Sequence, residues 1–259
     1  MALKVDLSGR VALVTGGGRG VGRGISESLL AAGAEVVICG RSEPEALPEA
    51  EGRRAHFCAA DVRELDQIEA LCAFAEDRFG RLDVLVNNAG GAPAAEAASA
   101  SPRFHESILR LNLIAPLHLS QRANRTMQTQ EEGGVVLFIT SVSALRPSPG
   151  TAAYGAAKAA LHSLTQSLAV EWAPRVRLMS VAAGMVKTEQ SELHYGDAEG
   201  VAAVSETVPL GRMAEPRDVG DACAFLASPL ASYASGSVLL LHGGGEPPAF
   251  LSAAVNTKS

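Results

Sequence analysis

The sequence predicts an α/β protein built on a doubly wound parallel sheet of about seven strands with helices on both faces. Short apolar, β-rich segments alternate with segments of helical periodicity, the pattern of repeated strand–helix–strand units. These strand segments are continuously apolar rather than alternating, as expected when helices cover both faces of a sheet. The predicted strands are residues 11–14, 36–39, 56–60, 84–86, 135–139, 176–182 and 238–241.

Two helices between these strands are predicted from apolar residues at helical spacing. Each set forms a stripe that packs on the sheet, so we interpret both as core rather than cofactor contacts. The stripes are Ile68, Leu71, Cys72, Ala75 and Phe79, and then Leu161, Leu164, Leu168 and Trp172. The loops at 41–53 and 91–101 are too short to be domain linkers, which predicts one domain over residues 1–259.

Composition narrows the classes of function. The chain has 259 residues, of which 47% are hydrophobic and 19% charged, enough to bury a substantial core. Its net charge of −6 comes from scattered residues, so neither nucleic acid nor an anionic membrane is an expected partner. No apolar run reaches about 18 residues, and residues 1–10 lack the apolar core of a signal peptide. These features predict a cytoplasmic protein.

The four cysteines are widely separated. Cys39, Cys58, Cys72 and Cys223 show no CxxC spacing and have no histidine pair nearby, so we expect neither a zinc site nor a disulfide framework. We predict that they are buried as small apolar residues. His242 also lacks a nearby histidine or carboxylate, and no metal site is predicted.

A glycine-rich segment follows the first predicted strand. Residues 15–22 read TGGGRGVG, and a helical pattern continues from them to Gly33. Gly16 permits a tight turn, Gly20 lets the backbone approach a pyrophosphate, and the helix N-terminus supplies N–H donors and a positive dipole. Its place between a strand and a helix favours a dinucleotide site over a plain flexible loop. The predicted cofactor contacts here are Gly16, Gly18, Arg19, Gly20, Val21 and Gly22.

The TGxxxGxG spacing differs from the GxGxxG of the general Rossmann fingerprint and resembles the short-chain dehydrogenase/reductase family. Residues 87–90 read NNAG and are similar to the family segment that lines the adenine-ribose side of the cofactor, through Asn88, Ala89 and Gly90. Asp61 and Val62 match the family's adenine contact, and residues 209–212, 225–228 and 231–236 resemble its C-terminal signature. The resemblance covers nearly the whole chain. It implies a Rossmann-type fold and a nicotinamide cofactor.

The end of the second predicted strand bears on which nicotinamide cofactor is used. An acid there would accept the ribose 2′-OH of NAD(H), whereas a base would hold the 2′-phosphate of NADP(H). At the position of Gly40, NAD-using members of the family resemble one another in having an Asp, which this chain lacks. The next residues are Arg41, whose guanidinium could bind a phosphate, and Ser42. This favours NADP(H). If Arg41 is only a solvated loop residue, NAD(H) is the alternative.

Tyr154 and Lys158 are four residues apart and share one face of a predicted helix. A free tyrosine has a pKa near 10. We expect Lys158 and the oxidised nicotinamide to stabilise the phenolate and lower the pKa of Tyr154. Ser141 precedes Tyr154 by thirteen positions, the separation seen in the family, where the serine hydroxyl stabilises charge on the substrate oxygen. Ser143 is a second hydroxyl that could equally cap a turn, so Ser141 ranks first.

Further site residues follow from the resemblance. Asn112 matches the asparagine that holds a water between Lys158 and solvent, although it could instead mark a helix bend near Pro116. Gly184, Val186 and Thr188 resemble the segment that holds the nicotinamide amide. The chain departs from the family at three positions, with Ala183 for proline, Phe138 for asparagine and His242 for aspartate.

The sequence therefore predicts an oxidoreductase that transfers a hydride between NADP(H) or NAD(H) and a carbonyl or secondary alcohol. The alternatives are a cofactor-sensing protein and a relative that performs dehydration or epimerisation on the same scaffold. The segment after Thr188 resembles the family's substrate lid, and its apolar residues favour a hydrophobic substrate. These residues are Leu193, His194, Tyr195, Val201 and Val204. A homotetramer or homodimer is expected through helices near 104–119 and 154–172.

Overall fold

Seven parallel strands form the central sheet in the order β5-β2-β1-β6-β7-β8-β9. This computed structural model describes residues 4–248 and Phe250, without the side chains of Leu193 and His194. Every predicted strand segment is a strand, so the predicted fold class is confirmed. The strands are β1 Val11–Thr15, β2 Glu35–Gly40, β5 His56–Ala59, β6 Val84–Asn87, β7 Gly134–Ser141, β8 Val176–Ala183 and β9 Ser237–Leu241.

Strand β1 lies at the point where the winding of the sheet reverses. It pairs with β2 on one side, where Val11 is opposite Glu35, and with β6 on the other, where Ala12 is opposite Val84. Ligands of doubly wound sheets bind beyond the carboxyl ends of the strands at this switch point. The loops after β1 and β6 are therefore the expected walls of a cofactor site.

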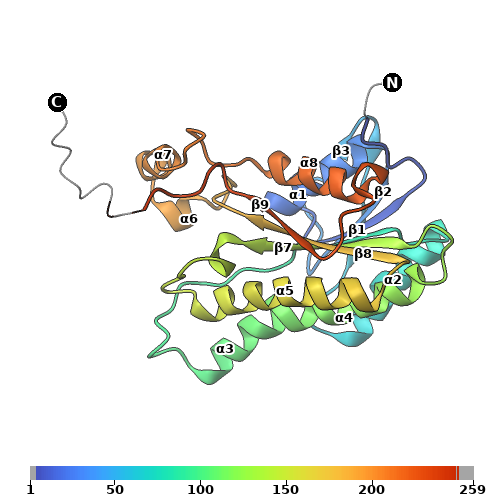
Figure 1. The fold of residues 1–259 in the computed structure, drawn as a ribbon, viewed down its shortest axis with the longest axis horizontal. Helices are drawn as coiled ribbons and strands as arrows, with labels where there is room; N and C mark the ends of the chain where they lie inside the picture. The colour runs from blue at the N-terminus through green and yellow to red at the C-terminus, as the bar shows by residue number, and fades with distance from the viewer. Residues whose placement is uncertain (1–3, 249, 251–259) are drawn as a thin grey trace.

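Helices cover both faces of the sheet (Figure 1). Helices α1 (Gly20–Ala31) and α8 (Pro216–Ala227) bury apolar residues in one core cluster, against alternate residues of the strands. Helices α2 (Leu65–Phe79), α4 (Ala115–Met127) and α5 (Ala152–Glu171) form the second cluster on the opposite face. Both predicted apolar stripes lie in this second cluster. Within the described part of the chain, no helix is both long and apolar enough to cross a membrane.

Local capping signals set several helix boundaries. Helix α3 (Pro102–Leu109) begins after Ser101, whose hydroxyl accepts a hydrogen bond from the Phe104 amide. Helix α8 begins with proline after Glu215, and the Asp218 carboxylate accepts a hydrogen bond from the Glu215 amide at 2.7 Å. Helix α2 ends at Gly80, which adopts the left-handed conformation.

Smaller elements occupy segments that the sequence pattern leaves as loops. Strands β3 (Glu49–Ala50) and β4 (Arg53–Arg54) form a short antiparallel hairpin between β2 and β5. After β8 come helices α6 (Glu192–Tyr195) and α7 (Ala198–Glu206). Their brevity explains why periodicity does not reveal them.

The cysteines are all free thiols. Cys39, Cys72 and Cys223 are buried, and burial raises the pKa of each to about 12. Cys58 is only partly buried, so the prediction of burial is wrong for this residue. The reason is its place on β5, which is an edge strand of the sheet.

Candidate active site

The glycine-rich loop folds tightly against itself between β1 and α1. Gly16 has a φ of 63°, as a turn that only glycine adopts freely requires. A Cβ atom on Gly22 would lie 2.1 Å from the Gly16 carbonyl oxygen, so α1 starts in direct contact with the turn. Across the loop, the Cβ position of Gly20 lies 3.6 Å from Cγ2 of Thr188. The glycine-rich loop and the predicted cofactor segment that ends at Thr188 therefore face each other.

Thr15 fixes this loop to the NNAG segment. Its hydroxyl oxygen accepts hydrogen bonds from the backbone amides of Asn88 and Ala89, both at 2.9 Å. The Asn88 side-chain amide donates in turn to the Thr15 carbonyl oxygen at 2.9 Å. Thr15 is a positioning residue that sequence reasoning missed, although it is the threonine of the TGxxxGxG pattern. The pairing of β1 with β6 brings the two segments together.

The predicted adenine contact is held by an arginine. The Asp61 carboxylate accepts a hydrogen bond from Nε of Arg63 at 2.9 Å. Hydrogen bonds from Arg63, with a smaller contribution from the charge of Arg41, lower the pKa of Asp61 to about 2. Arg63 is not among the site residues predicted from the sequence. Val62, between these two residues, is buried.

The strand end that bears on cofactor choice is open to solvent. Arg41 and Ser42 are exposed directly after β2. A Cβ atom on Gly40 would meet only ordinary contacts, the nearest being the Ser42 carbonyl oxygen at 3.5 Å. The fold therefore does not require glycine at this position.

Ser141, Tyr154 and Lys158 meet at the carboxyl end of β7. Ser141 is the last residue of β7, and the other two lie in the first turns of α5. Lys158 is buried, and its ammonium donates a hydrogen bond to the Ile139 carbonyl oxygen at 2.9 Å. The same nitrogen lies 5.5 Å from the centroid of the Tyr154 ring. The hydroxyl of Ser141 also accepts a hydrogen bond from the Ser143 amide at 3.1 Å, so Ser141 caps the 3₁₀ turn Val142–Ala144.

Burial is the main cause of the pKa shifts of Tyr154 and Lys158. Desolvation raises the pKa of Tyr154, and a hydrogen bond with Ser141 opposes the shift. Lys158 does not produce the lowering expected of it, because its ammonium binds a carbonyl and lies over the ring. The lowering expected from a bound oxidised nicotinamide stays a prediction. Burial lowers the pKa of Lys158 to about 8.

Asn112 lies in a π-helix, Arg110–Ile114, inserted between α3 and α4. Its side chain is fully buried and clamps the backbone of Gly91, accepting from the amide and donating to the carbonyl, each at 2.9 Å. A Cβ atom on Gly90 would lie 2.6 Å from Oδ1 of Asn112 and 3.2 Å from Nζ of Lys158. Glycine at position 90 thus keeps open the space between these two polar groups. Single-turn π-helices are frequent at functional sites.

The segment after β8 returns to the site. Gly184 donates a hydrogen bond to the Leu241 carbonyl oxygen at 2.8 Å, and Val186 forms a parallel bridge with Ala214. The residues on either side of Val186 make the bridging hydrogen bonds, so its own N–H and C=O point away from Ala214. The Thr188 amide is held by the Ser191 hydroxyl at 2.8 Å.

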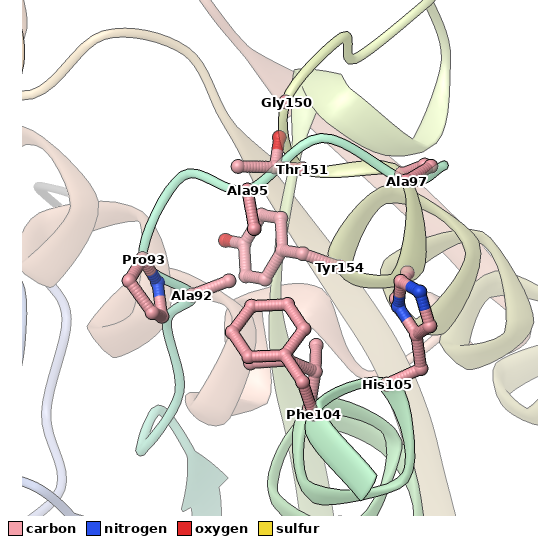
Figure 2. A pocket seen from close by; sticks show the side chains of 12 residues that line it. Ala92, Pro93, Ala95, Ala97, Phe104, His105, Gly150, Thr151 and Tyr154 are labelled. Carbon is pink, nitrogen blue, oxygen red and sulfur yellow. The ribbon is translucent and has the colours of Figure 1, made fainter. Parts of the chain in front are cut away.

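Tyr154 helps to line a small apolar hollow (Figure 2). The loop after Gly91 forms one wall, and α3 forms another with Phe104 and His105. The amide of Ala95 donates to the Gly150 carbonyl oxygen at 2.8 Å, which joins this loop to the segment before α5. The lining is rich in alanine: Ala92, Ala95, Ala97, Ala152 and Ala153.

Comparisons with known proteins agree with this geometry. A profile of the family described as Enoyl-(Acyl carrier protein) reductase matches residues 16–246. A tropinone reductase homolog of Arabidopsis thaliana is 38% identical over 248 residues, covering 92% of this chain and 93% of the relative. The chain belongs to the short-chain dehydrogenase/reductase family. The prediction made from its motifs is confirmed.

Two further members of the short-chain dehydrogenase/reductase family support this assignment. The 3-oxoacyl-[acyl-carrier-protein] reductase FabG of Vibrio cholerae is 35% identical over 243 residues, covering 93% of this chain and 98% of that protein. A 7α-hydroxysteroid dehydrogenase structure with NADH and 7-oxo glycochenodeoxycholic acid has a TM-score of 0.85 at 29% identity, covering 96% and 99% of the two chains. The protein is an NAD(P)-dependent oxidoreductase that acts on small molecules.

The three departures from the family pattern lie outside the Ser141, Tyr154 and Lys158 group. Phe138 is fully buried in the core cluster that also contains Leu119 and Leu161. Ala183 ends β8 and is buried. His242 packs directly on the nicotinamide-side segment, because a Cβ atom on Gly184 would lie 2.9 Å from its Cα atom.

The predicted substrate lid corresponds to helices α6 and α7. Val201 is buried, while Tyr195 and Val204 are partly exposed. Burial raises the pKa of Tyr195, and its charge raises that of Tyr154, which places Tyr195 on the side of the site that bears the phenol. The side chains of Leu193 and His194 lie outside the described residues.

Proposed function

We propose that this enzyme interconverts a carbonyl compound and a secondary alcohol, with Tyr154 as the general acid and base. The observation that carries the proposal is the convergence of Ser141, Tyr154 and Lys158 beside a glycine cradle that a single Cβ atom would fill. A bound nicotinamide would supply or accept the hydride. The same convergence argues against a cofactor-sensing protein, which would not need these three side chains together.

In the reductive direction, Tyr154 would give its phenolic proton to the substrate oxygen. The phenol carries its proton at neutral pH, as a proton donor must before the reaction. Ser141 would donate a hydrogen bond to the same oxygen as negative charge develops there. Lys158 would hold the nicotinamide ribose, and Asn112 would hold a water on the path from Lys158 to solvent.

For the cofactor, the glycine loop would bind the pyrophosphate at the N-terminus of α1, through Gly16, Gly18, Arg19, Gly20, Val21 and Gly22. Asp61 and Val62 would contact the adenine, Asn88, Ala89 and Gly90 the adenosine ribose side, and Gly184, Val186 and Thr188 the nicotinamide amide. NADP(H) is proposed over NAD(H), because Arg41 and Ser42 are exposed beside a residue that carries no carboxylate.

The substrate is proposed to be a hydrophobic ketone or alcohol. The apolar hollow at Tyr154 supports this choice, because its alanine-rich walls offer few hydrogen-bond partners (Figure 2). The other candidate reactions on this scaffold are dehydration and epimerisation. Neither of them consumes the nicotinamide cofactor, so cofactor consumption distinguishes them from carbonyl reduction. The test is to follow nicotinamide absorbance with NADPH and NADH against a panel of ketones and alcohols. Net oxidation of cofactor is expected, and conversion of substrate without it would contradict the proposal.

We also propose a homodimer or homotetramer through the helices near 104–119 and 154–172. Val170 on α5 is 80% exposed and Ile114 before α4 is 39% exposed, so both offer apolar surface that a second copy of the chain would cover. Light scattering at micromolar concentration tests this assembly. A mass near 26.7 kDa would contradict it.

A further inference from the structure

An ion pair joins two distant segments of the chain near the mouth of the site. Nη2 of Arg146 lies 2.7 Å from Oε1 of Glu246, one hundred residues along the chain. Arg146 belongs to the segment that leads from Ser141 to Tyr154. Glu246 follows β9 closely, in the segment where His242 packs on Gly184. Both partners thus lie in segments that also carry the proposed site.

The segment that carries Glu246 is fixed in place. The Leu210 amide donates to the Gly243 carbonyl oxygen at 3.0 Å, which ties this segment to the end of the lid. The Gly245 amide donates to the His242 carbonyl oxygen at 3.0 Å. The Glu246 carboxylate is therefore presented to Arg146 by a backbone that is anchored on both the lid and β9.

The guanidinium lies within electrostatic reach of the substrate side. Tyr195, in the lid, feels the positive charge of Arg146 and the negative charge of Glu246, in addition to its burial. Tyr154 in turn feels the charge of Tyr195. Arg146 therefore lies close enough to the lid for its charge to act on Tyr195.

We propose that Arg146 is a specificity-determining residue that binds a carboxylate on the carbonyl substrate, and that Glu246 occupies its guanidinium until substrate replaces it. A guanidinium can grip a carboxylate with two donors, but here the carboxylate uses one, and Nη1 makes only a long contact of 3.4 Å with the Pro147 carbonyl oxygen. Arg146 is 43% and Glu246 38% exposed, so exchanging one carboxylate for another costs little.

The inference rests on the proposed carbonyl chemistry and narrows its substrate class. One end of the substrate would be apolar, to enter the hollow at Tyr154, and the other would be anionic. This arrangement separates keto acids from neutral ketones of the same shape, because a neutral ester cannot replace Glu246 on the guanidinium.

The test uses pairs of aryl keto acids and their methyl esters, with two to six methylene groups between ketone and carboxylate. Affinity is measured by calorimetry with cofactor present, and turnover by nicotinamide absorbance. For the best pair, wild type should bind the acid about 10-fold more tightly than the ester, as expected for a charge-assisted contact. Arg146→Gln should abolish this preference by raising KM for the acid while leaving kcat and the ester unchanged.

Glu246→Gln provides a second, independent variant. It removes the competing carboxylate and should raise affinity for the acid by about 2- to 5-fold. Arg125→Gln is the matched control, because Arg125 also pairs with a glutamate, Glu69, but lies on α4 outside the site. Equal binding of acid and ester by wild type, or an unchanged preference in Arg146→Gln, would overturn the proposal. Preferential binding of the acid without turnover of either compound would support Arg146 and contradict the carbonyl chemistry instead.

Discussion

The proposed cofactor end of the site is lined by different groups from the proposed substrate end. At the cofactor end, backbone groups and glycines make the walls, and a Cβ atom on Gly22 would meet a carbonyl oxygen at 2.1 Å. At the substrate end, side chains make the walls, and Tyr195 and Arg146 remain partly exposed. The first end is therefore intolerant of change, while the second can vary without disturbing the sheet.

This difference explains how one scaffold serves many substrates. The relatives are named for tropinone, for acyl groups on a carrier protein and for hydroxysteroids, yet each matches more than nine-tenths of this chain. A substitution that clashes with backbone, as at Gly22, is costly, whereas half-exposed side chains can be exchanged at small cost. Tyr154 lies at the boundary between the two ends.

Changing Tyr154 to Phe should have the largest effect on activity, because it removes the proposed proton donor at the boundary between the two ends. The change removes one oxygen and leaves the glycine cradle intact, so cofactor affinity should be unchanged. General acid–base catalysis typically contributes about 10²- to 10⁴-fold, and kcat should fall by at least the lower figure. Steady-state kinetics and a cofactor titration provide the measurement.

Ser141→Ala serves as the graded control for this result. It deletes a hydrogen bond to the substrate oxygen rather than the proton itself, so its loss in kcat should be smaller. If Tyr154→Phe binds cofactor normally and keeps a rate close to that of wild type, the phenol is not the acid and the proposed mechanism is wrong.

The buried Lys158 should make stability depend on pH above neutrality. Its pKa is about 8 in the folded protein and 10.5 when exposed, so the unfolded chain binds more protons between these values. Stability should therefore rise with pH across this window. Relative to Lys158→Met, wild type should gain about 2 to 3 kcal/mol in unfolding free energy between pH 7 and pH 10.

Urea unfolding of both proteins at the two pH values measures this gain. Lys187→Met is the matched control, because Lys187 is exposed close to the same site. A Lys158→Met difference that stays constant from pH 7 to pH 10 would show that the folded protein does not penalise the buried charge.

Gly22→Ala sharpens the comparison at the cofactor end. The added methyl group must displace the Gly16 carbonyl, at a cost of about 1 to 3 kcal/mol for overpacking. Melting temperature and cofactor affinity should both decrease. Gly40→Ala is the control in the same region, because its Cβ position meets only ordinary contacts. Equal losses in the two variants would mean that the cradle is not sterically closed.

The smallest effects on activity are expected at Arg41, where a side chain rather than the backbone is proposed to set the preference between NADP(H) and NAD(H). Arg41→Ala should raise KM for NADP(H) by about 10-fold through the lost charge-assisted contact, with NAD(H) kinetics nearly unchanged. Gly40→Asp should shift preference toward NAD(H), since a Cβ atom at this position meets only ordinary contacts. Equal changes for both cofactors would contradict the assignment of Arg41.

The sequence alone determined the strands, the glycine loop and the Tyr154–Lys158 pair. Each depends on residues close together in the chain: continuous apolar runs, a turn at Gly16, and an i,i+4 spacing on one helix. The ordered motifs together identified the family without any coordinates. Local patterns suffice here because backbone geometry, rather than long-range packing, fixes what these residues can do.

Tertiary structure alone decided how distant residues combine. Thr15 meets Asn88 because β1 pairs with β6, and Arg146 meets Glu246 because β9 returns the chain to the lid. Burial raises the pKa of Tyr154, and the Lys158 ammonium expected to lower it instead binds the Ile139 carbonyl. Burial and charge pairing are sums over neighbours from the whole fold, and spacing in the chain does not encode these sums.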